Sequence, residues 1–480
     1  MSVAPALAQR PSARPRDLAA AARVPVAVWA AALAVALRLV YGLPQVGYDA
    51  WWSLAWGRAA AHGAVPGLTA TLAPTPHPLA ILLAAPLSLL GPAAPAVLGV
   101  LALAVLAALG TTACVLGARL FGPAAGVLAA ALLLTRPLLV GQALQCSVDV
   151  PFLALVLGAG AALTRGRDRR ALVLLALAGL LRPEAWPLAL AAAVWTAWPR
   201  PSSSRALAVA LALAAAGPVL WALFDLVCTG DPLHSLHGTR ELADGLGRPR
   251  SLGTALHVAP DYLTVVLGDG VALLGGAAAI AAVWLDGRRA VLPLVVLGAG
   301  VAGFLVLGVV GLPLLYRYTL LPAAALALLA AWAPGALAGH VRPALARGGA
   351  LAVLALLLAT VPAARDGILR QTHAARGALA EQRDLTALLR APAVARDLAA
   401  CGPARLAQQR PAPQVAYLAG RAPVVSAAAP ATGVVLVPVP GSRAIGDRLA
   451  PTDQPIPDPV VTARARPLAT HGAWRALSAC

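Results

Sequence analysis

The chain has 480 residues, of which 60% are hydrophobic and only 12% are charged. Soluble domains carry about 25% charged residues, and the mean hydropathy here is +0.79. The formal net charge of +18 could indicate a nucleic-acid partner, but many arginines lie between apolar segments, where the positive-inside rule places them. The composition therefore predicts a polytopic membrane protein and argues against nucleic-acid binding.

The N-terminal part of the sequence sets the orientation. Residues 1–23 carry four arginines and are predicted to form a cytoplasmic tail. A first span at about 24–41 resembles the core of a signal peptide, but further spans follow and we interpret it as retained. The loop 42–77 is then expected to lie outside the cell.

An uncharged run at residues 78–118 has two interpretations. It could form two spans, or a short membrane-associated helix (79–91) followed by one span (about 96–118), because the first piece is too short to cross a bilayer. With one crossing, Arg119 and the arginine cluster at 165–170 both lie inside, so charge favours the second interpretation.

Nine more apolar segments give about eleven spans in a transmembrane body, residues 24–364. The two segments between residues 171 and 199 form a short hairpin, and they are the least certain pair in this count of spans. The segments lie at about 122–141, 150–164, 171–181, 185–199, 206–228, a stretch ending at 286, 290–312, 318–334 and 349–364.

The C-terminal segment, residues 365–480, has more charged residues and prolines than the body. An amphipathic helix is predicted at 371–390, and short buried strands at 413–420 and 433–439. The fold class is therefore mainly α, with a small extracytoplasmic α/β domain. Cys401 and Cys480 form an even pair in this domain and predict a disulfide, the alternative being two free thiols.

The acidic residues of the membrane body are distributed unevenly. Three lie among cytoplasmic arginines, and the other nine are predicted at or near the outer face, which suggests one external active surface. Ionisable groups at membrane depth are costly and mark functional sites. The nine are Asp49, Asp149, Glu184, Asp225, Asp231, Glu241, Asp244, Asp261 and Asp269.

Asp49 is the leading candidate. Its segment "YDAWWSLAWGRAAAHG" is interpreted as a helix N-capped near Asp49, with Trp51, Trp52 and Trp56 at the bilayer interface. His77, between two prolines in "TPHPL", could bind a phosphate, orient Asp49 or ligate a metal. The alternatives are plain capping and anchoring for Asp49, and a solvated interfacial histidine for His77.

Further candidates lie at other outer turns. Arg182 and Glu184 in "LLRPEAW" either pair structurally or line a polar cavity. Arg317, between Tyr316 and Tyr318 in "LLYRYTLLP", suits phosphate oxygens, or it is a snorkelling arginine in an aromatic belt.

Two more outer segments contain candidate groups. Asp149 begins a span in "SVDVPF" and is a substrate-binding candidate or a helix cap. The H-x-x-H spacing at 234–237 is a weak metal signal without a further ligand at fixed spacing.

Three short motifs together resemble the GT-C superfamily of membrane glycosyltransferases, which includes protein O-mannosyltransferases and the aminoarabinose transferases of lipid A. They are "YDAWW" at 48–52, "PHPL" at 76–79 and "RYTLLP" at 317–322. The resemblance covers the membrane body, and Ala50 stands where many members carry a second acid. It implies a multi-pass cell-membrane enzyme that transfers a sugar, with inversion, from a polyprenyl-phosphate carrier on the outer face.

The resemblance also implies roles for residues. Asp49 would be the general base on the acceptor hydroxyl, and Arg317, with Arg182 and His77, would stabilise the leaving phosphate. Nearby aromatic rings are expected to raise the pKa of Asp49. The acceptor stays open between a glycan, a lipid and a protein, and so does a divalent metal requirement.

Two other classes of protein are alternatives to a glycosyltransferase. A transporter or flippase of an envelope precursor would share the polytopic topology, but the sequence has no inverted repeat and its acids gather on one face. A scaffold whose C-terminal domain binds envelope partners is the third class.

Overall fold

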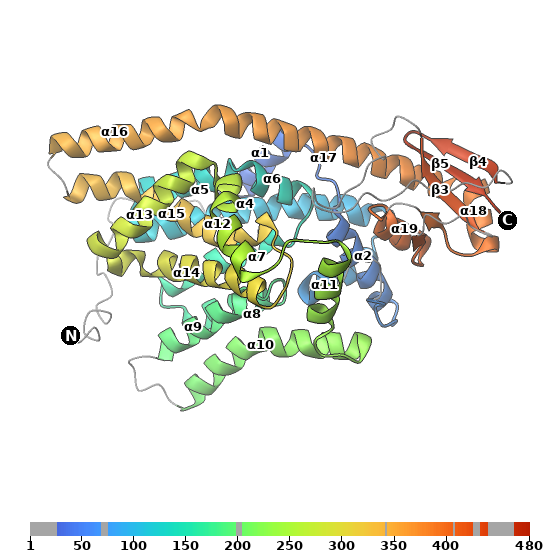
Figure 1. Cartoon of the computed structure of the whole chain (residues 1–480), viewed down its shortest axis with the longest axis horizontal. Coiled ribbons are helices and arrows are strands. Elements are labelled where there is room, and N and C mark those ends of the chain that lie inside the picture. Colours follow the sequence, from blue (N-terminus) through green and yellow to red (C-terminus); the bar gives the residue numbers. More distant parts are fainter. Residues whose placement is uncertain are drawn as a thin grey trace.

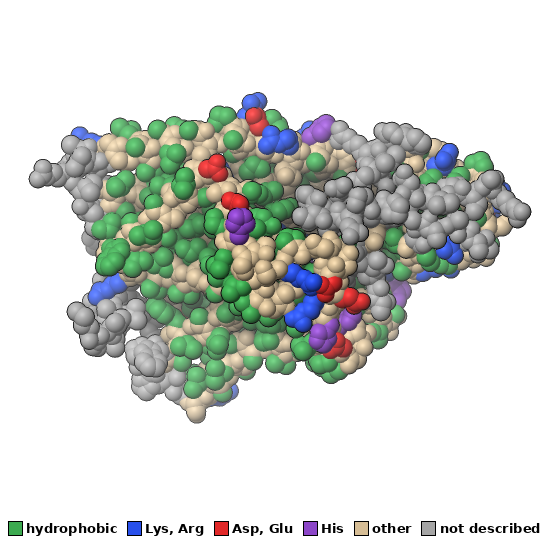
Figure 2. All heavy atoms as spheres, viewed as in Figure 1, with side chains coloured by type: hydrophobic (Ala, Val, Ile, Leu, Met, Phe, Trp, Pro, Cys, Tyr) green, Lys and Arg blue, Asp and Glu red, His purple; other side chains and the backbone are tan. Residues whose placement is uncertain are grey.

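The computed structural model describes residues 26–68, 75–197, 204–340, 343–406, 409–425, 433–439 and 465–480. It consists of a helical body, whose longer helices run roughly along the long axis, and a small α/β domain at one end of that axis (Figure 1). The hydrophobic side chains that cover much of the body in Figure 2 suit a surface that faces lipid.

The first helices agree with one of the two interpretations of the run at 78–118. Helix α1 (Val26–Tyr41) is followed by α2 (Tyr48–Ala61), the short α3 (Pro78–Ser88), a 3-10 turn η2 (Gly91–Ala93) and the 28-residue α4 (Ala94–Phe121). Only α4 of the last three is long enough to cross a bilayer of about 30 Å. The predicted short helix followed by one span is confirmed.

The rest of the body contains twelve described helices. Five stretches of the described chain are long and apolar enough to cross a membrane, or seven if each of two bent helix pairs is one span, and four shorter apolar helices accompany them. The elements are α5 (Pro123–Leu134), α6 (Pro137–Leu144), α7 (Asp149–Leu163), α8 (Asp168–Gly179), α9 (Ala185–Ala197), α10 (Ser204–Thr229), α11 (His234–Gly245), α12 (Leu252–Leu267), α13 (Asp269–Leu285), α14 (Gly287–Val309), η3 (Tyr316–Thr319) and α15 (Leu320–His340).

The segment predicted as one span at 122–141 is a bent pair of helices and not one continuous helix. Helices α5 and α6 meet at 64°, with Arg136 at the break and Pro137 opening α6, because proline lacks the N–H that would continue the first helix. Arg136 is buried and donates to the carbonyls of Leu132, at 3.0 Å, and Leu267. Leu267 ends α12 at the second break, so one guanidinium caps two helix ends.

A long helical arm joins the body to the C-terminal domain. Helix α16 (Pro343–Ala359) and α17 (Val361–Arg390) follow the body from one end to the other and bring the chain to the domain (Figure 1). The amphipathic helix predicted at 371–390 is the last part of α17.

The C-terminal domain packs α18 (Pro392–Cys401) and α19 (Ala412–Ala419) with a five-stranded sheet. The strand order is β2-β1-β3-β5-β4, with β2, β1 and β3 parallel and the other pairs antiparallel. The strands are β1 (Arg405–Leu406), β2 (Val424–Val425), β3 (Val434–Pro438), β4 (Arg466–His471) and β5 (Trp474–Ser478).

One predicted strand of this domain is confirmed and the other is wrong. The stretch 433–439 contains β3, with four buried residues in a row. The stretch 413–420 is helix α19, which ends at Gly420 in the left-handed conformation (φ 74°) that glycine adopts readily. The apolar run was too short for periodicity to separate a helix from a strand.

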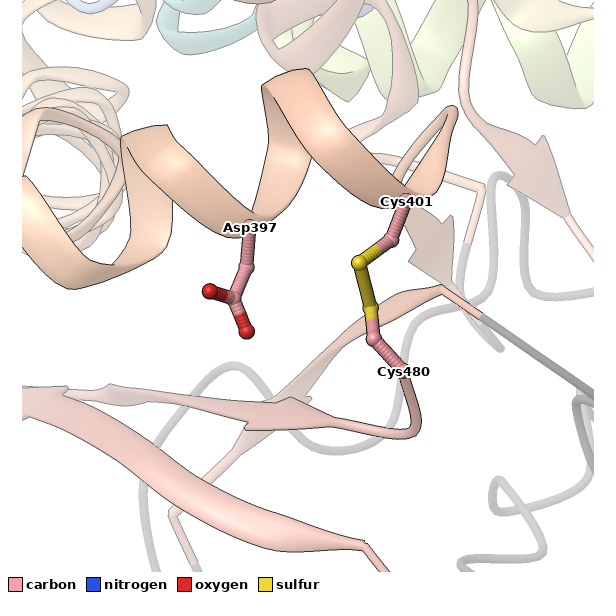
Figure 3. A group of neighbouring side chains, drawn as sticks. All are labelled: Asp397, Cys401 and Cys480. Atoms are coloured by element: carbon pink, nitrogen blue, oxygen red, sulfur yellow. A yellow bond between two sulfur atoms is a disulfide. The ribbon is translucent and has the colours of Figure 1, made fainter.

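A disulfide joins Cys401, at the end of α18, to Cys480 after β5, with Cα atoms 6.0 Å apart (Figure 3). Asp397 lies near both sulfur atoms and, with them, forms the one three-residue group in the described chain that is spaced for a metal ion. The sulfur atoms are bonded to each other, and Asp397 pairs with Arg466 at 3.1 Å. The group is therefore a disulfide with an ion pair beside it.

Removing this disulfide should destabilise the C-terminal domain. The bridge closes a loop with a sequence separation of 79, for which the chain-entropy model gives about 4–5 kcal/mol. We expect a Cys401→Ser/Cys480→Ser variant to lose protection of β3 and β5 amides in hydrogen exchange, while amides of α4 keep theirs. Unchanged protection of β3 and β5 would contradict the prediction.

Candidate active site

Asp49 lies in the first turn of α2 but does not cap the helix. The N-cap is Gly47, and no side chain makes a capping hydrogen bond there, so the predicted capping role of Asp49 is wrong. Gly47 donates from its N–H to the carbonyl of Gln145 at 2.9 Å. A side chain at position 47 would lie 2.6 Å from that oxygen, so glycine permits the close approach.

The carboxylate of Asp49 pairs with Arg317 instead. Arg317 lies in η3, directly before α15, and its Nη1 donates to Oδ2 of Asp49 at 2.9 Å. The two side chains are 37% and 31% exposed. The guanidinium also lies 5.6 Å from the ring centre of Tyr318, and its Nε has no hydrogen-bond partner among the described residues.

Asp49 is ionised at neutral pH. Burial acts to raise the pKa of its carboxyl, but the positive charge of Arg317, with smaller contributions from His77 and Arg248, outweighs burial and holds the pKa below its usual value of 3.8. The expectation that aromatic surroundings raise this pKa is wrong, because the sequence does not reveal that a guanidinium contacts the carboxylate.

The ion pair borders a cavity of about 430 Å³ between the end of the body and the C-terminal domain. Its walls include the start of α2, helix α6, α11 with the segment after it, η3, and helix α17 with the C-terminal domain. Among the predicted site residues, Asp49, Tyr316, Arg317 and Tyr318 line it.

Other lining residues were not predicted, because single residues in separate helices, strands and turns carry no motif. They include Arg248, Arg410, Trp474 and several glutamines.

The three tryptophans of α2 are inside the protein. Trp51, Trp52 and Trp56 are 4%, 4% and 5% exposed, so their expected position at the bilayer interface is wrong. Helix α19 covers this part of α2, and the ring of Trp51 lies 5.6 Å from that of Tyr417. Sequence alone did not show that the C-terminal domain docks there.

The docking of α19 on α2 is held by polar contacts. Arg58 of α2 donates to the carbonyl of Tyr417 and lies 5.8 Å from the centre of its ring. The hydroxyl of Tyr417 donates to the carbonyl of Gly91 at 3.0 Å. The helix that carries Asp49 is therefore fixed from the body side and from the domain side.

Asp149, Arg182 and Glu184 form a buried charged group behind the cavity and are not among its lining residues. Arg182 is 6% exposed and pairs with Oδ1 of Asp149 and, at 2.5 Å, with Oε1 of Glu184. Its guanidinium lies 4.9 Å from the ring centre of Tyr318. Tyr318 thus has Arg182 and Arg317 as neighbours, which links the buried group to η3.

Replacing Arg182 should destabilise the body strongly. An Arg182→Met variant would leave Asp149 and Glu184 as buried carboxylates without their cation, and breaking such a group costs about 3–5 kcal/mol. We expect a lower thermal unfolding midpoint in detergent. Arg288→Met, in an exposed position of α14, is the control and should leave the midpoint unchanged; equal midpoints for both variants would contradict the prediction.

His77 lies just before α3, behind the cavity, and is not among its lining residues. Its Nδ1 lies 2.8 Å from the carbonyl oxygen of Leu181, and a carbonyl only accepts, so Nδ1 carries the proton. Burial lowers the pKa of His77 to about 4, although the charge of Asp49 acts to raise it. His77 is therefore neutral at pH 7, and its Nε2 is an acceptor.

The lowered pKa of His77 predicts a pH-dependent stability. The unfolded state binds a proton below about pH 6.5, while the folded state does so only near pH 4. The free energy of unfolding should therefore fall as the pH drops from about 6.5 towards 4. His77→Gln should flatten this dependence in pH-resolved thermal unfolding, and an unchanged slope would contradict the assignment.

The remaining acids that were predicted at the outer face are not among the lining residues of the cavity. Asp225 is buried on α10 and accepts hydrogen bonds from the amide and hydroxyl of Ser235, each within 2.9 Å. Asp231 accepts from His237 at 2.7 Å on the surface. The H-x-x-H pair thus gains no described set of metal ligands.

Comparison with known proteins gives a fold class. No protein-family model matches the sequence, and no curated protein matches it significantly. Among solved structures, the chain is similar to ArnT from Cupriavidus metallidurans bound to undecaprenyl phosphate, with a TM-score of 0.58 and 14% identity over 94% of this chain and 98% of that one.

A second similarity is to the oligosaccharyltransferase of Archaeoglobus fulgidus. The apo form gives a TM-score of 0.52 at 14% identity, and the complex of AglB with an inhibitory peptide and a dolichol-phosphate gives 0.51 at 13%. The match covers 84% of this chain but 64% of that one, so this chain spans just under two thirds of the oligosaccharyltransferase. Both neighbours are GT-C membrane glycosyltransferases, and the chain described here is a membrane protein with the GT-C fold.

Proposed function

We propose that this protein is an inverting glycosyltransferase that takes a sugar from a polyprenyl-phosphate carrier and transfers it to an envelope acceptor on the extracytoplasmic face. The observation that carries the proposal is the Asp49–Arg317 ion pair on the cavity at the end of the membrane body. Arg248 and Arg410 add positive charge to the same cavity. The solved neighbours bound to undecaprenyl phosphate and dolichol-phosphate support a lipid donor.

The leaving phosphate would bind at Arg317. A guanidinium matches phosphate oxygens with two parallel hydrogen bonds, and Nε of Arg317 is a buried donor without a partner among the described residues. A phosphate on this side competes with Asp49 for Arg317, and Arg317 stabilises the negative charge that develops on the phosphate as its bond to the sugar breaks. Tyr316 and Tyr318, the neighbours of Arg317 along the chain, also line the cavity and would complete the binding site of the sugar donor.

Asp49 would act as the general base. It is ionised in the resting state, and arrival of the donor phosphate at Arg317 frees its oxygen atoms. The acceptor oxygen forms a bond to the anomeric carbon as the bond from that carbon to the phosphate oxygen breaks. The proton of the acceptor hydroxyl passes to Asp49. The electron pair of the broken bond between the sugar and the phosphate leaves with the polyprenyl phosphate. Such assistance accelerates reactions by roughly 10²–10⁴.

Residues behind the cavity have positioning roles in this proposal. Arg182, with Asp149 and Glu184, supports Tyr318 and hence η3. His77 fixes the start of α3 against Leu181. The described residues around Asp49 do not include a group of three clustered metal ligands.

The proposal is tested by the envelope of a strain that lacks this gene. We expect one sugar residue to be missing from envelope glycoconjugates and its polyprenyl-phosphate donor to accumulate. Complementation with the wild-type chain should restore the sugar. If sealed vesicles instead show that the chain moves a lipid-linked precursor across the bilayer, with the glycosidic linkage intact, a transporter is indicated and the proposal fails.

A further inference from the structure

Three glutamines on one side of the cavity have unused hydrogen-bonding capacity. Gln142 and Gln145 lie at the end of α6, Gln371 lies on α17, and all three line the cavity. Their side-chain amides make no hydrogen bond to any residue in the described part of the chain. We call these three residues the amide cluster.

Two other glutamines of the cavity show the contrast. Gln382 donates to Oε1 of Gln45 at 2.7 Å and to the carbonyl of Val46 at 2.6 Å. Gln414 donates to the carbonyl of Gln382 at 2.7 Å and to Thr386 at 3.0 Å. These amides hold the domain against the body, so their polarity has a structural reason that the amide cluster lacks.

The three residues of the amide cluster differ in burial: Gln142 is buried, Gln371 is half-buried and Gln145 is exposed. The amide atoms of Gln142 are not among the fully buried atoms without a partner, so they are open to the cavity, where water or a ligand can satisfy them. The amide of Gln371 lies against Gly141, where a side-chain carbon would come within 2.6 Å of its Oε1. Because position 141 has no side chain, Gln371 of α17 can bring its side-chain amide close to the end of α6, where Gln142 and Gln145 lie.

The backbone connects the amide cluster to Asp49. Gln45 and Gly47 donate to the carbonyls of Leu144 and Gln145 at 3.0 and 2.9 Å, which joins the end of α6 to the chain just before Asp49. The carboxylate of Asp49 contacts Arg317. Asp49 thus contacts a cationic side chain directly, and the backbone just before it is joined to the end of α6.

The chemistry of the cluster identifies its ligand. A carboxamide offers two donors and one acceptor, which matches neighbouring hydroxyl groups that both donate and accept, and it carries no charge that would require an ionic ligand. An inverting displacement places the acceptor on the face of the sugar opposite the leaving phosphate. With phosphate at Arg317, the amide cluster, which lines the same cavity, is left to hold the acceptor.

We infer that the amide cluster, Gln142, Gln145 and Gln371, is the acceptor subsite and that the acceptor is a saccharide. This inference rests on the proposed function and narrows its acceptor, which the sequence left open between glycan, lipid and protein. The three residues are binding residues for hydroxyl groups of the acceptor sugar.

The test uses the full chain in lipid nanodiscs and neutral probes. Saturation-transfer NMR would measure binding of a methyl hexopyranoside, a methyl pentofuranoside and an acetylated serine-containing peptide. We expect at least one glycoside to bind the wild type and Asp49→Asn equally. A Gln142→Leu/Gln371→Leu variant should weaken that binding about tenfold or more, because two hydrogen bonds are lost.

Controls separate this inference from the proposed function. Gln409→Leu changes an amide with an unpartnered oxygen that does not line the cavity and should leave glycoside binding unchanged. If the double variant does not fold, Gln145→Leu, at an exposed position, replaces it. Equal glycoside binding by the wild type and the cluster variant, or binding of the peptide alone, would overturn the inference. The proposed function fails separately, if the chain releases no polyprenyl phosphate from any donor.

Discussion

Replacing Asp49 with asparagine should lower the rate of sugar transfer by roughly 10²–10⁴. The amide cannot accept the proton of the acceptor, although it is nearly the same size as the carboxylate. Because both partners of the Asp49–Arg317 pair are about one third exposed, the pair contributes little to stability. The thermal unfolding midpoint of Asp49→Asn should therefore stay close to that of the wild type.

The rate of transfer is measured with purified chain and a polyprenyl-phosphate sugar, at equal amounts of protein. Asp261→Asn is the matched control, since Asp261 is exposed on α12 and does not line the cavity; its rate should equal that of the wild type. A rate for Asp49→Asn within a few-fold of the wild type would remove Asp49 as the base.

Replacing Arg317 should have an effect of similar size for a different reason. In Arg317→Met the developing charge on the phosphate loses its nearest cation, and the loss of one such interaction costs about 10²–10³ in rate. Arg317→Lys keeps the charge but not the planar pair of donors, so its rate should lie between those of the wild type and Arg317→Met. Transfer rates of the three proteins at saturating donor give the comparison.

A double variant distinguishes a shared role from two separate ones. If Asp49 and Arg317 act in one displacement, Asp49→Asn/Arg317→Met should be little slower than the slower single variant, because effects of residues that act as a unit are not additive. Fully multiplicative losses would instead indicate that the two residues support independent steps.

The sequence predicted those site residues that lie near one another along the chain or that belong to a recurring motif. The resemblance placed Asp49 and Arg317 in one active site, but nothing in the sequence predicted their direct contact, because 268 positions separate them. Their contact depends on how η3 meets α2. That contact is also why the predicted direction of the pKa shift of Asp49 was wrong.

The C-terminal domain explains most of what the sequence did not reveal. Helix α19 covers α2, so tryptophans that suit a bilayer interface are buried in the protein. The same domain supplies Arg410 and Trp474 to the cavity. Hydrophobic patterning predicts which segments bury an apolar face, but not which other segment covers that face. Hydrophobic patterning therefore could not predict that the C-terminal domain docks on the helical body.

The broken helices were missed for a local reason. Periodicity and charge predicted one span at 122–141 although Arg136 and Pro137 lie within it. The structure uses both residues to end one helix and start the next, which turns α6 and its glutamines towards the cavity. A buried arginine satisfied by helix carbonyls needs no acidic partner, so no charge pattern indicated it.

We expect this chain to break the bond between a sugar and polyprenyl phosphate at Asp49 and Arg317. Phosphorus-31 NMR of the purified chain in nanodiscs, with lipid-linked sugar donors and an envelope extract as the acceptor, tests it most directly. We predict that the phosphodiester signal of one donor converts to that of a phosphomonoester with the wild type, and that the signal persists with Asp49→Asn. No conversion of any donor, or equal conversion by both proteins, would contradict the claim.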